Sequence, residues 1–246
     1  KEGKSFFDYA QRSIDALVDG KAAFQRSLRN QAETLHLATA RGIGTYILPG
    51  LLRDFRASSP DITPHISVGR STEVLNMVLR DEVQLGLCRS LKHPDIDSIY
   101  LYDEEIVLVT NPSHPFAQRD GVSILEVSRE PLILYDPGSI YFLMINQVCR
   151  EAGIKPRVEM SLDSIEATKQ MIEIGMGISF LPRNGIRYEL ERKSLSVVTL
   201  IGTHRVTLPT SIILRRSEHY PNTVSSFLKL LENVYNKKIL FAKPNP

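Results

Sequence analysis

Two strand–turn–helix units in residues 35–89 constrain the fold of this chain more than any other feature of its sequence. In the first unit, apolar Leu35 and Leu37 lead into a turn of small residues at 38–44. Apolar side chains then recur at helical spacing from Tyr46 to Phe55, which predicts a helix after an open turn.

The second unit repeats the first. Ile66 and Val68 predict a strand, residues 69–73 a turn, residues 74–79 a helix, and residues 84–87 a further apolar strand. Strands that alternate with helices predict an α/β fold with an open sheet, in which the turns after the strands line the ligand crevice.

Composition places the chain among ordinary globular proteins. With 246 residues, of which 42% are hydrophobic, it is long enough for one or two domains with full cores. Its 30 basic and 28 acidic residues are interleaved and give a net charge of +2, so nucleic-acid binding is expected from a different segment.

The two cysteines, Cys88 and Cys149, are far apart in sequence and predict neither a disulfide framework nor a zinc site. The sequence has no apolar run of the ~20 residues that a membrane span needs. It also lacks a signal-peptide core. We therefore expect a cytoplasmic protein.

The first thirty residues have a different pattern. Apolar residues alternate three and four positions apart over about three heptads, which predicts a long helix that pairs with a second helix. The expected dimerisation residues are Phe7, Ile14, Leu17, Phe24 and Leu28. An amphipathic helix packed on its own domain is the alternative. We expect these residues to begin within a connector helix.

A second set of strand–helix units follows residues 111–115, where two prolines interrupt regular structure. Strands are expected at 131–135, 158–162 and 178–181, with helices at 141–152 and 165–174. A last strand at 210–214 and a helix at 223–235 are expected to pack with the first set of strand–helix units, which gives the chain two lobes. The predicted domains are a linker helix at 1–30, lobe I at 31–110 and 207–236, lobe II at 111–206, and a tail at 237–246.

Four turns place small or hydroxyl-bearing residues just before a helix. Helix N-termini present unpaired N–H groups and partial positive charge, so converging N-termini bind carboxylate, phosphate or sulfate. The expected effector-binding residues are Ala40, Arg41, Gly42, Ser71, Thr72, Ser139, Tyr141, Asp163 and Ser164. Ser139 and Ser164 are alternatively plain N-caps, and Arg41 is alternatively a solvated loop cation.

Catalysis has little support in the sequence. The 6 histidines form no HxxxH or HExxH pair, and neither a Gly-x-Ser-x-Gly elbow nor a phosphate-binding glycine-rich loop is present. We expect neither an enzyme nor a cofactor or metal site.

Several motifs together resemble one family. After the heptad connector come YILP at 46–49, VLRDEVQLGL at 78–87, EPLI at 130–133 and GMGISFLP at 175–182. In this order and spacing they resemble the linker helix and effector-binding domain of LysR-type transcriptional regulators. The chain departs from the family pattern at Gln84 and at Arg41, and Arg41 bears on effector choice.

The resemblance implies a bacterial regulator with a two-lobed domain similar to type II periplasmic binding proteins. A small, anionic metabolite is expected in the cleft between the lobes, where it alters the geometry of DNA binding. The family binds promoter DNA through an N-terminal helix-turn-helix, absent from these residues, and forms dimers, with tetramers for the full-length protein.

Two other classes share a two-lobed scaffold. A solute-binding protein of a transport system is expected to have a secretion signal and no heptad connector. An enzyme of the porphobilinogen deaminase class requires a cofactor-bearing cysteine or an acid–base constellation.

Overall fold

The computed structural model describes residues 14–18, 20–21, 34–217 and 219–237. It divides into two compact units, unit 1 (Lys1–Tyr102 with Pro209–Pro246) and unit 2 (Asp103–Leu208). The chain leaves unit 1 within strand β4 (Ile96–Thr110) and returns within strand β11 (Val206–Arg215). Unit 2 is therefore one continuous segment, whereas unit 1 is made of two.

Unit 1 is built on a mixed sheet with the strand order β2-β1-β3-β11-β4. Strands β1 (Thr34–Ala40), β2 (Thr63–Gly69) and β3 (Leu85–Arg89) are parallel, and β11 is antiparallel to β3. The parallel strands follow from the two strand–helix units of the sequence, because each helix carries the chain back to the start of the next strand.

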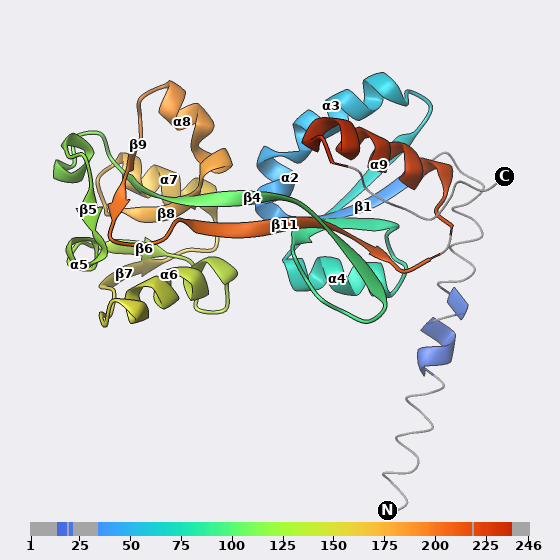
Figure 1. Ribbon diagram of the computed structural model, residues 1–246, viewed down its shortest axis with the longest axis horizontal. Coiled ribbons are helices and arrows are strands. Elements are labelled where there is room, and N and C mark those ends of the chain that lie inside the picture. The colour runs from blue at the N-terminus through green and yellow to red at the C-terminus, as the bar shows by residue number, and fades with distance from the viewer. Residues whose placement is uncertain (1–13, 19, 22–33, 218, 238–246) are drawn as a thin grey trace, which may run out of the picture. The chain divides into compact units, whose positions relative to one another are not determined.

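Helices cover both faces of this sheet (Figure 1). Helix α3 (Leu48–Ser58) and helix α9 (Asn222–Tyr235) pack on the face that holds Leu35 and Leu37, where the Phe55 and Phe227 rings meet edge to face at 5.2 Å. Helix α4 (Ser71–Leu79) covers the other face, against Ala38, Cys88 and Ile213. The period of two in β1 thus divides the core of unit 1 into two layers.

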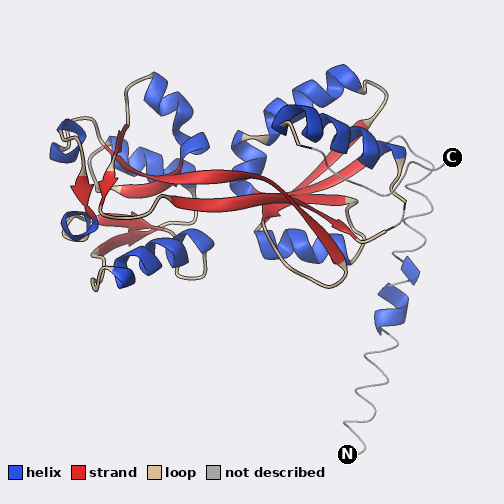
Figure 2. Ribbon diagram, in the orientation of Figure 1, coloured by secondary structure: helices blue, strands red, loops and turns tan. Residues whose placement is uncertain are grey.

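Unit 2 has shorter strands, distinguished from helices by colour in Figure 2. The end of β4 pairs antiparallel with β8 (Ser179–Pro182) and β9 (Ser196–Val198). Parallel pairs join β6 (Leu132–Leu134) to β7 (Val158–Ser161) and β10 (Leu200–Ile201) to β5 (Val122–Ser123).

The helices of unit 2 also lie on both sides of β4. Ile106 and Leu108 face a cluster that includes helix α5 (Ile124–Val127) and helix α6 (Ile140–Glu151). Val107 and Val109 face helix α7 (Ile165–Glu173), the 3-10 helix Arg183–Ile186 and helix α8 (Arg187–Glu191). A further 3-10 helix spans Pro115–Gln118.

A buried ionic group joins α7 to α8. Lys169, whose exposed fraction is 5%, lies 2.8 Å from Glu189 Oε1 and 2.9 Å from Glu166 Oε1. Its ammonium also donates to the Gly185 carbonyl at 3.1 Å. A buried ammonium is tolerated only with such partners, so this group fixes how α8 lies against α7.

The predicted α/β class is confirmed, and most predicted elements are present within one or two residues. The run 104–110 predicts an apolar strand, which is the second half of β4. The first half of β4 was missed, because polar Asp97, Ser98 and Asp103 interrupt the apolar pattern. Helices α5 and α8 were also missed, since four and five residues are too few to show a helical period. No helix among the described residues is long and apolar enough to cross a membrane.

Gly177, within the GMGISFLP motif, is a test of this packing. A Cβ at Gly177 would clash with the Pro131 carbonyl oxygen, which accepts the Ile178 N–H at 3.0 Å. We expect Gly177→Ala to lower the free energy of unfolding by about 1–3 kcal/mol through overpacking. Urea denaturation measures this change.

Gly50→Ala is the matched control. A Cβ at Gly50 meets nothing within 4 Å, and this glycine lies in α3. Because alanine favours a helix over glycine by up to about 1 kcal/mol, this variant should be neutral or more stable. An equal loss of stability in both variants would contradict the packing argument.

Candidate functional site

The start of α2 and the start of α4 lie at one edge of the unit 1 sheet. Strands β1 and β2 pair in parallel register up to Ala40 and Gly69, so the chain leaves both strands at neighbouring points. Helix α2 (Arg41–Tyr46) begins directly after Ala40, and α4 begins at Ser71. The predicted residues Ala40, Arg41, Gly42, Ser71 and Thr72 are thus brought to the same edge.

The predicted open turn at residues 38–44 is wrong. Ala38, Thr39 and Ala40 belong to β1, and the helix begins at Arg41 rather than at Tyr46. The Thr39 side chain is buried under α2, where a Cβ on Gly44 would approach its Cγ2 to 2.7 Å. The small residues therefore serve a close contact between helix and strand, not a flexible turn.

A carboxylate already lies at the N-terminus of α4. Glu73 accepts a hydrogen bond from the Arg70 N–H at 2.6 Å, and its Oε2 lies where a Cβ on Gly69 would be placed. An anion bound there has to share the N–H groups with Glu73. The sequence analysis missed this role, although a glutamate at the third position of a helix is the sequence signature of a capping box.

The other two turns meet in unit 2. Strands β6 and β7 pair in parallel, with Leu134 opposite Ser161, so α6 and α7 begin at neighbouring points. Ser139 Oγ accepts the Phe142 N–H at 3.1 Å, and Ser164 Oγ accepts the Ala167 N–H at 3.3 Å. Both serines are N-caps in this structure, and each hydroxyl still carries a proton to donate. Asp163 is exposed before α7.

A buried carboxylate lies close to Tyr141. Burial, together with the smaller effect of the negative charge of Glu104, raises the pKa of Tyr141 to about 12, so this phenol is a neutral hydrogen-bonding group. Its ring lies 4.8 Å from that of Tyr135. Glu104 accepts hydrogen bonds from the Asn184 N–H at 3.2 Å and from Asn184 Nδ2 at 2.6 Å. Burial nevertheless raises the pKa of Glu104.

The Glu104–Asn184 pair was missed by sequence reasoning. Its members are 80 positions apart, and only the alignment of β4 with the 3-10 helix Arg183–Ile186 brings them together. The signal in the sequence was a glutamate within an apolar strand.

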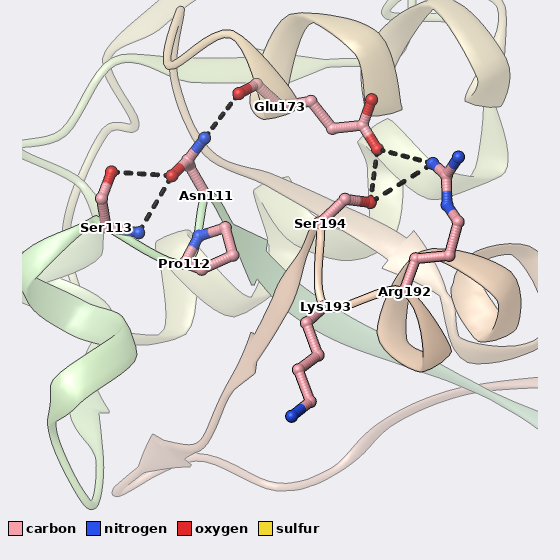
Figure 3. Close-up of a pocket in the computed structure, with 7 residues that line it drawn as sticks. All are labelled: Asn111, Pro112, Ser113, Glu173, Arg192, Lys193 and Ser194. Atoms are coloured by element: carbon pink, nitrogen blue, oxygen red, sulfur yellow. Dashed lines mark hydrogen bonds and ion pairs between the residues drawn. The ribbon is translucent and has the colours of Figure 1, made fainter.

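A hollow of about 630 Å³ lies elsewhere in unit 2 (Figure 3). Its lining residues are Asn111, Pro112, Ser113, Glu173, Arg192, Lys193 and Ser194. None of the predicted effector-binding residues lines this hollow.

The two cysteines and the metal-ligating residue types form no second site among the described residues. Cys88 and Cys149 are buried free thiols in different units, and burial raises the pKa of both, that of Cys88 to about 12. Within the described residues, no group of three or more His, Cys, Asp or Glu side chains is arranged to hold a metal.

The predicted dimerisation residues are only partly described. Ile14 and Leu17 lie in a helix with exposed fractions of 54% and 74%. Phe7, Phe24 and Leu28 lie outside the described residues.

Comparisons with known proteins agree on one family. The model of the LysR substrate binding domain matches residues 29–236. A probable RuBisCO transcriptional regulator of Thalassiosira pseudonana is 27% identical over 253 residues, which cover 94% of this chain and 79% of the relative.

Solved structures show the same fold. The CcmR regulatory domain of Synechocystis PCC6803 in complex with 2-PG has a TM-score of 0.75 at 23% identity, covering 86% of this chain and 99% of that one. The effector binding domain of QuiR in complex with shikimate has a TM-score of 0.72 at 18% identity, covering 84% of this chain and 99% of that one.

Glu104 predicts a specific dependence of stability on pH. Its pKa in the folded chain lies above the ordinary value of 4.5, so its ionisation opposes folding. Its contribution to stability is therefore greatest below pH 4.5 and declines as the pH rises through the folded pKa. We expect the free energy of unfolding of wild type, minus that of Glu104→Gln, to fall as the pH rises above 4.5. Urea denaturation across this range measures the difference.

Glu191→Gln is the control, because it makes the same change of charge at an exposed site. If both variants give the same trend with pH, the buried position of Glu104 is not its cause.

Proposed function

The chain belongs to the LysR substrate binding domain family, and from this premise we propose that it senses a small anionic metabolite for a transcriptional regulator. The match over residues 29–236 carries this conclusion. It favours the regulator over a transport protein, since the relatives are transcriptional regulators. The family is not one of enzymes.

Helix N-termini support an anionic effector. Helices α4, α6 and α7 have 9, 12 and 9 residues, enough for an appreciable dipole at each N-terminus. Thr72, Ser139 and Ser164 add hydroxyl donors at these N-termini. A carboxylate accepts several such donors at once. The complex of the QuiR domain with shikimate, itself a carboxylate, favours this class of ligand.

Two protein carboxylates narrow the class of effector. Glu73 lies at the N-terminus of α4, and Glu104 lies beside Tyr141. Each repels a second negative charge near it. We therefore propose an effector with one acidic group and neutral hydroxyl or ring groups, rather than a dicarboxylate.

Membership of the family also supports proposals about DNA binding, location and self-association. We propose that promoter DNA is bound by a helix-turn-helix outside these 246 residues and that the protein acts in the cytoplasm. We also propose self-association through the helix that carries Ile14 and Leu17, as a dimer, with a tetramer for the full-length protein. The effector then shifts the balance between protomer arrangements and so the spacing of the DNA-reading heads.

Binding of monocarboxylates tests the effector proposal. We would screen shikimate, benzoate, amino acids, dicarboxylates, sulfate and phosphate by thermal shift, followed by calorimetry. A ligand at 100 times its dissociation constant stabilises the folded state by about 2.7 kcal/mol. We expect the best ligand to be a monocarboxylate, and Thr72→Ala or Ser164→Ala to weaken its binding by about 1.5–3 kcal/mol.

Each variant is compared with its own ligand-free state, because loss of the Ser164 cap by itself costs about 1 kcal/mol. Ser128→Ala is the control, since Ser128 lies outside the predicted site and its hydroxyl donates to the Leu125 carbonyl. A best ligand that is cationic or uncharged would refute the anion proposal. Unchanged binding in both site variants would refute the site.

Self-association is tested on the exposed helix. Ile14 and Leu17 lie three positions apart, and we expect both to become buried in a dimer. The double variant Ile14→Asp and Leu17→Asp should raise the dimer dissociation constant at least about tenfold, because two charges replace buried apolar groups. Sedimentation equilibrium measures this constant. A wild-type chain that remains monomeric up to millimolar concentration would refute the proposal.

A further inference from the structure

The ends of α7 and α8 form a surface on unit 2 that the effector proposal leaves unused. The hollow of Figure 3 lies here, lined by polar and charged side chains together with Pro112. We name this surface the α7–α8 face and define it by the hollow together with Ile174, Met176 and Tyr188. It contains none of the predicted effector or dimerisation residues.

Hydrogen bonds hold the wall of the hollow in place. Glu173 Oε1 accepts a hydrogen bond from Ser194 at 2.6 Å and lies 3.4 Å from Arg192 Nη2. Asn111 Nδ2 donates to the Glu173 carbonyl at 2.5 Å. These bonds join the end of α7 to the loop after β4 and to the segment after α8, so the hollow is built from three parts of the chain (Figure 3).

Lys193 is the cation of this face without a partner. In Figure 3 its side chain extends away from the Glu173–Arg192 pair, and no ion pair joins it to another described residue. Its φ of +59° is left-handed, a conformation that a helix end ordinarily gives to glycine. The backbone closure of α8 needs only the Lys193 N–H, which donates to the Leu190 carbonyl. The lysine side chain therefore takes no part in ending the helix.

Apolar side chains are also exposed at the end of α7 and on α8. Ile174 and Tyr188 have exposed fractions of 71% and 62%, and Met176 is also exposed. The Arg192 guanidinium lies 4.5 Å from the centre of the Tyr188 ring and so connects this ring to the ion pair with Glu173. Exposed apolar groups beside a polar rim are typical of protein-binding surfaces.

The segment that forms α8 and one wall of the hollow is basic. Residues 183–194 carry four exposed cations, Arg183, Arg187, Arg192 and Lys193. Arg183 pairs with Glu105 and Arg192 with Glu173, whereas no ion pair joins Arg187 or Lys193 to another described residue. Of the two acidic residues in this segment, Glu189 is buried against Lys169, which leaves Glu191 as the exposed one.

We propose that the α7–α8 face docks an acidic segment of a partner protein, with apolar side chains of that segment on Ile174, Met176 and Tyr188. Positive charge selects an acidic partner. The exposed apolar side chains favour a peptide over DNA, because phosphates gain nothing from contact with isoleucine and methionine side chains. A partner carboxylate engages Lys193 at the hollow.

A labelled peptide tests the proposal on the 246-residue chain. The probe is a fluorescein-labelled octapeptide of alternating glutamate and leucine, and its binding is followed by fluorescence anisotropy. We expect a dissociation constant below about 1 mM that rises with salt between about 50 and 500 mM. A peptide with glutamine in place of glutamate should bind more weakly, by about tenfold.

Variants locate the binding. Lys193→Asn removes the charge with a residue that tolerates left-handed backbone, and we expect it to weaken binding about fivefold. Ile174→Ser should weaken it by about as much through lost apolar contact. Lys155→Asn is the matched control, an exposed lysine elsewhere on unit 2, and should bind as wild type does. Circular dichroism melting confirms that each variant is folded.

Four results would overturn the proposal. They are the absence of binding at about 1 mM peptide, an equal loss in Lys155→Asn, full displacement of the peptide by an equimolar DNA duplex, and self-association of the chain that Ile174→Ser abolishes without peptide. The last two would assign the face to DNA or to a second copy.

Discussion

The parallel pairing of strands is the constraint on which the candidate site depends. In unit 1, β1 and β2 stay in register to Ala40 and Gly69, and in unit 2, β6 and β7 end together near Leu134 and Ser161. Parallel strands end at the same edge of a sheet, so the helices that follow begin side by side. A change of register by one residue would turn the core faces outward as well as separate the helix starts.

The sequence was sufficient for the α/β class, because Leu35 and Leu37 alternate with polar residues and helical periods follow them. It was not sufficient for the turn after β1, where small residues marked close packing against Thr39 rather than an open loop. Nor could it reveal Glu104 and Asn184, since a hydrogen bond across 80 positions depends on the tertiary fold. The effector-binding roles of Ser139 and Ser164 remain predictions, while their capping bonds are seen directly.

Buried charge gives unit 2 its internal order. Lys169 pairs with Glu189 and donates a hydrogen bond to the Gly185 carbonyl. Asn184, next to Gly185, donates a hydrogen bond to Glu104 on β4. Apolar packing alone tolerates small shifts, whereas a buried ionic hydrogen bond is satisfied in one geometry only. This series of contacts therefore fixes the short helix α8, whose five residues would not be stable alone. These contacts therefore also position the α7–α8 face.

The insertion of unit 2 within unit 1 also sets an order of events during synthesis. Unit 1 is incomplete until β11 and α9 have been made, because β11 fills the position between β3 and β4 and α9 covers Leu35 and Leu37. The hydroxyls of Ser90 and Ser211, 2.5 Å apart, are separated by 121 positions in the chain. Unit 2, as one continuous segment, is fully synthesised at Leu208, before most of β11 and all of α9. Non-local pairing is slow, and domains fold as units. We therefore expect unit 2 to complete its fold first, while β3 of unit 1 has an unpaired edge until β11 has been made.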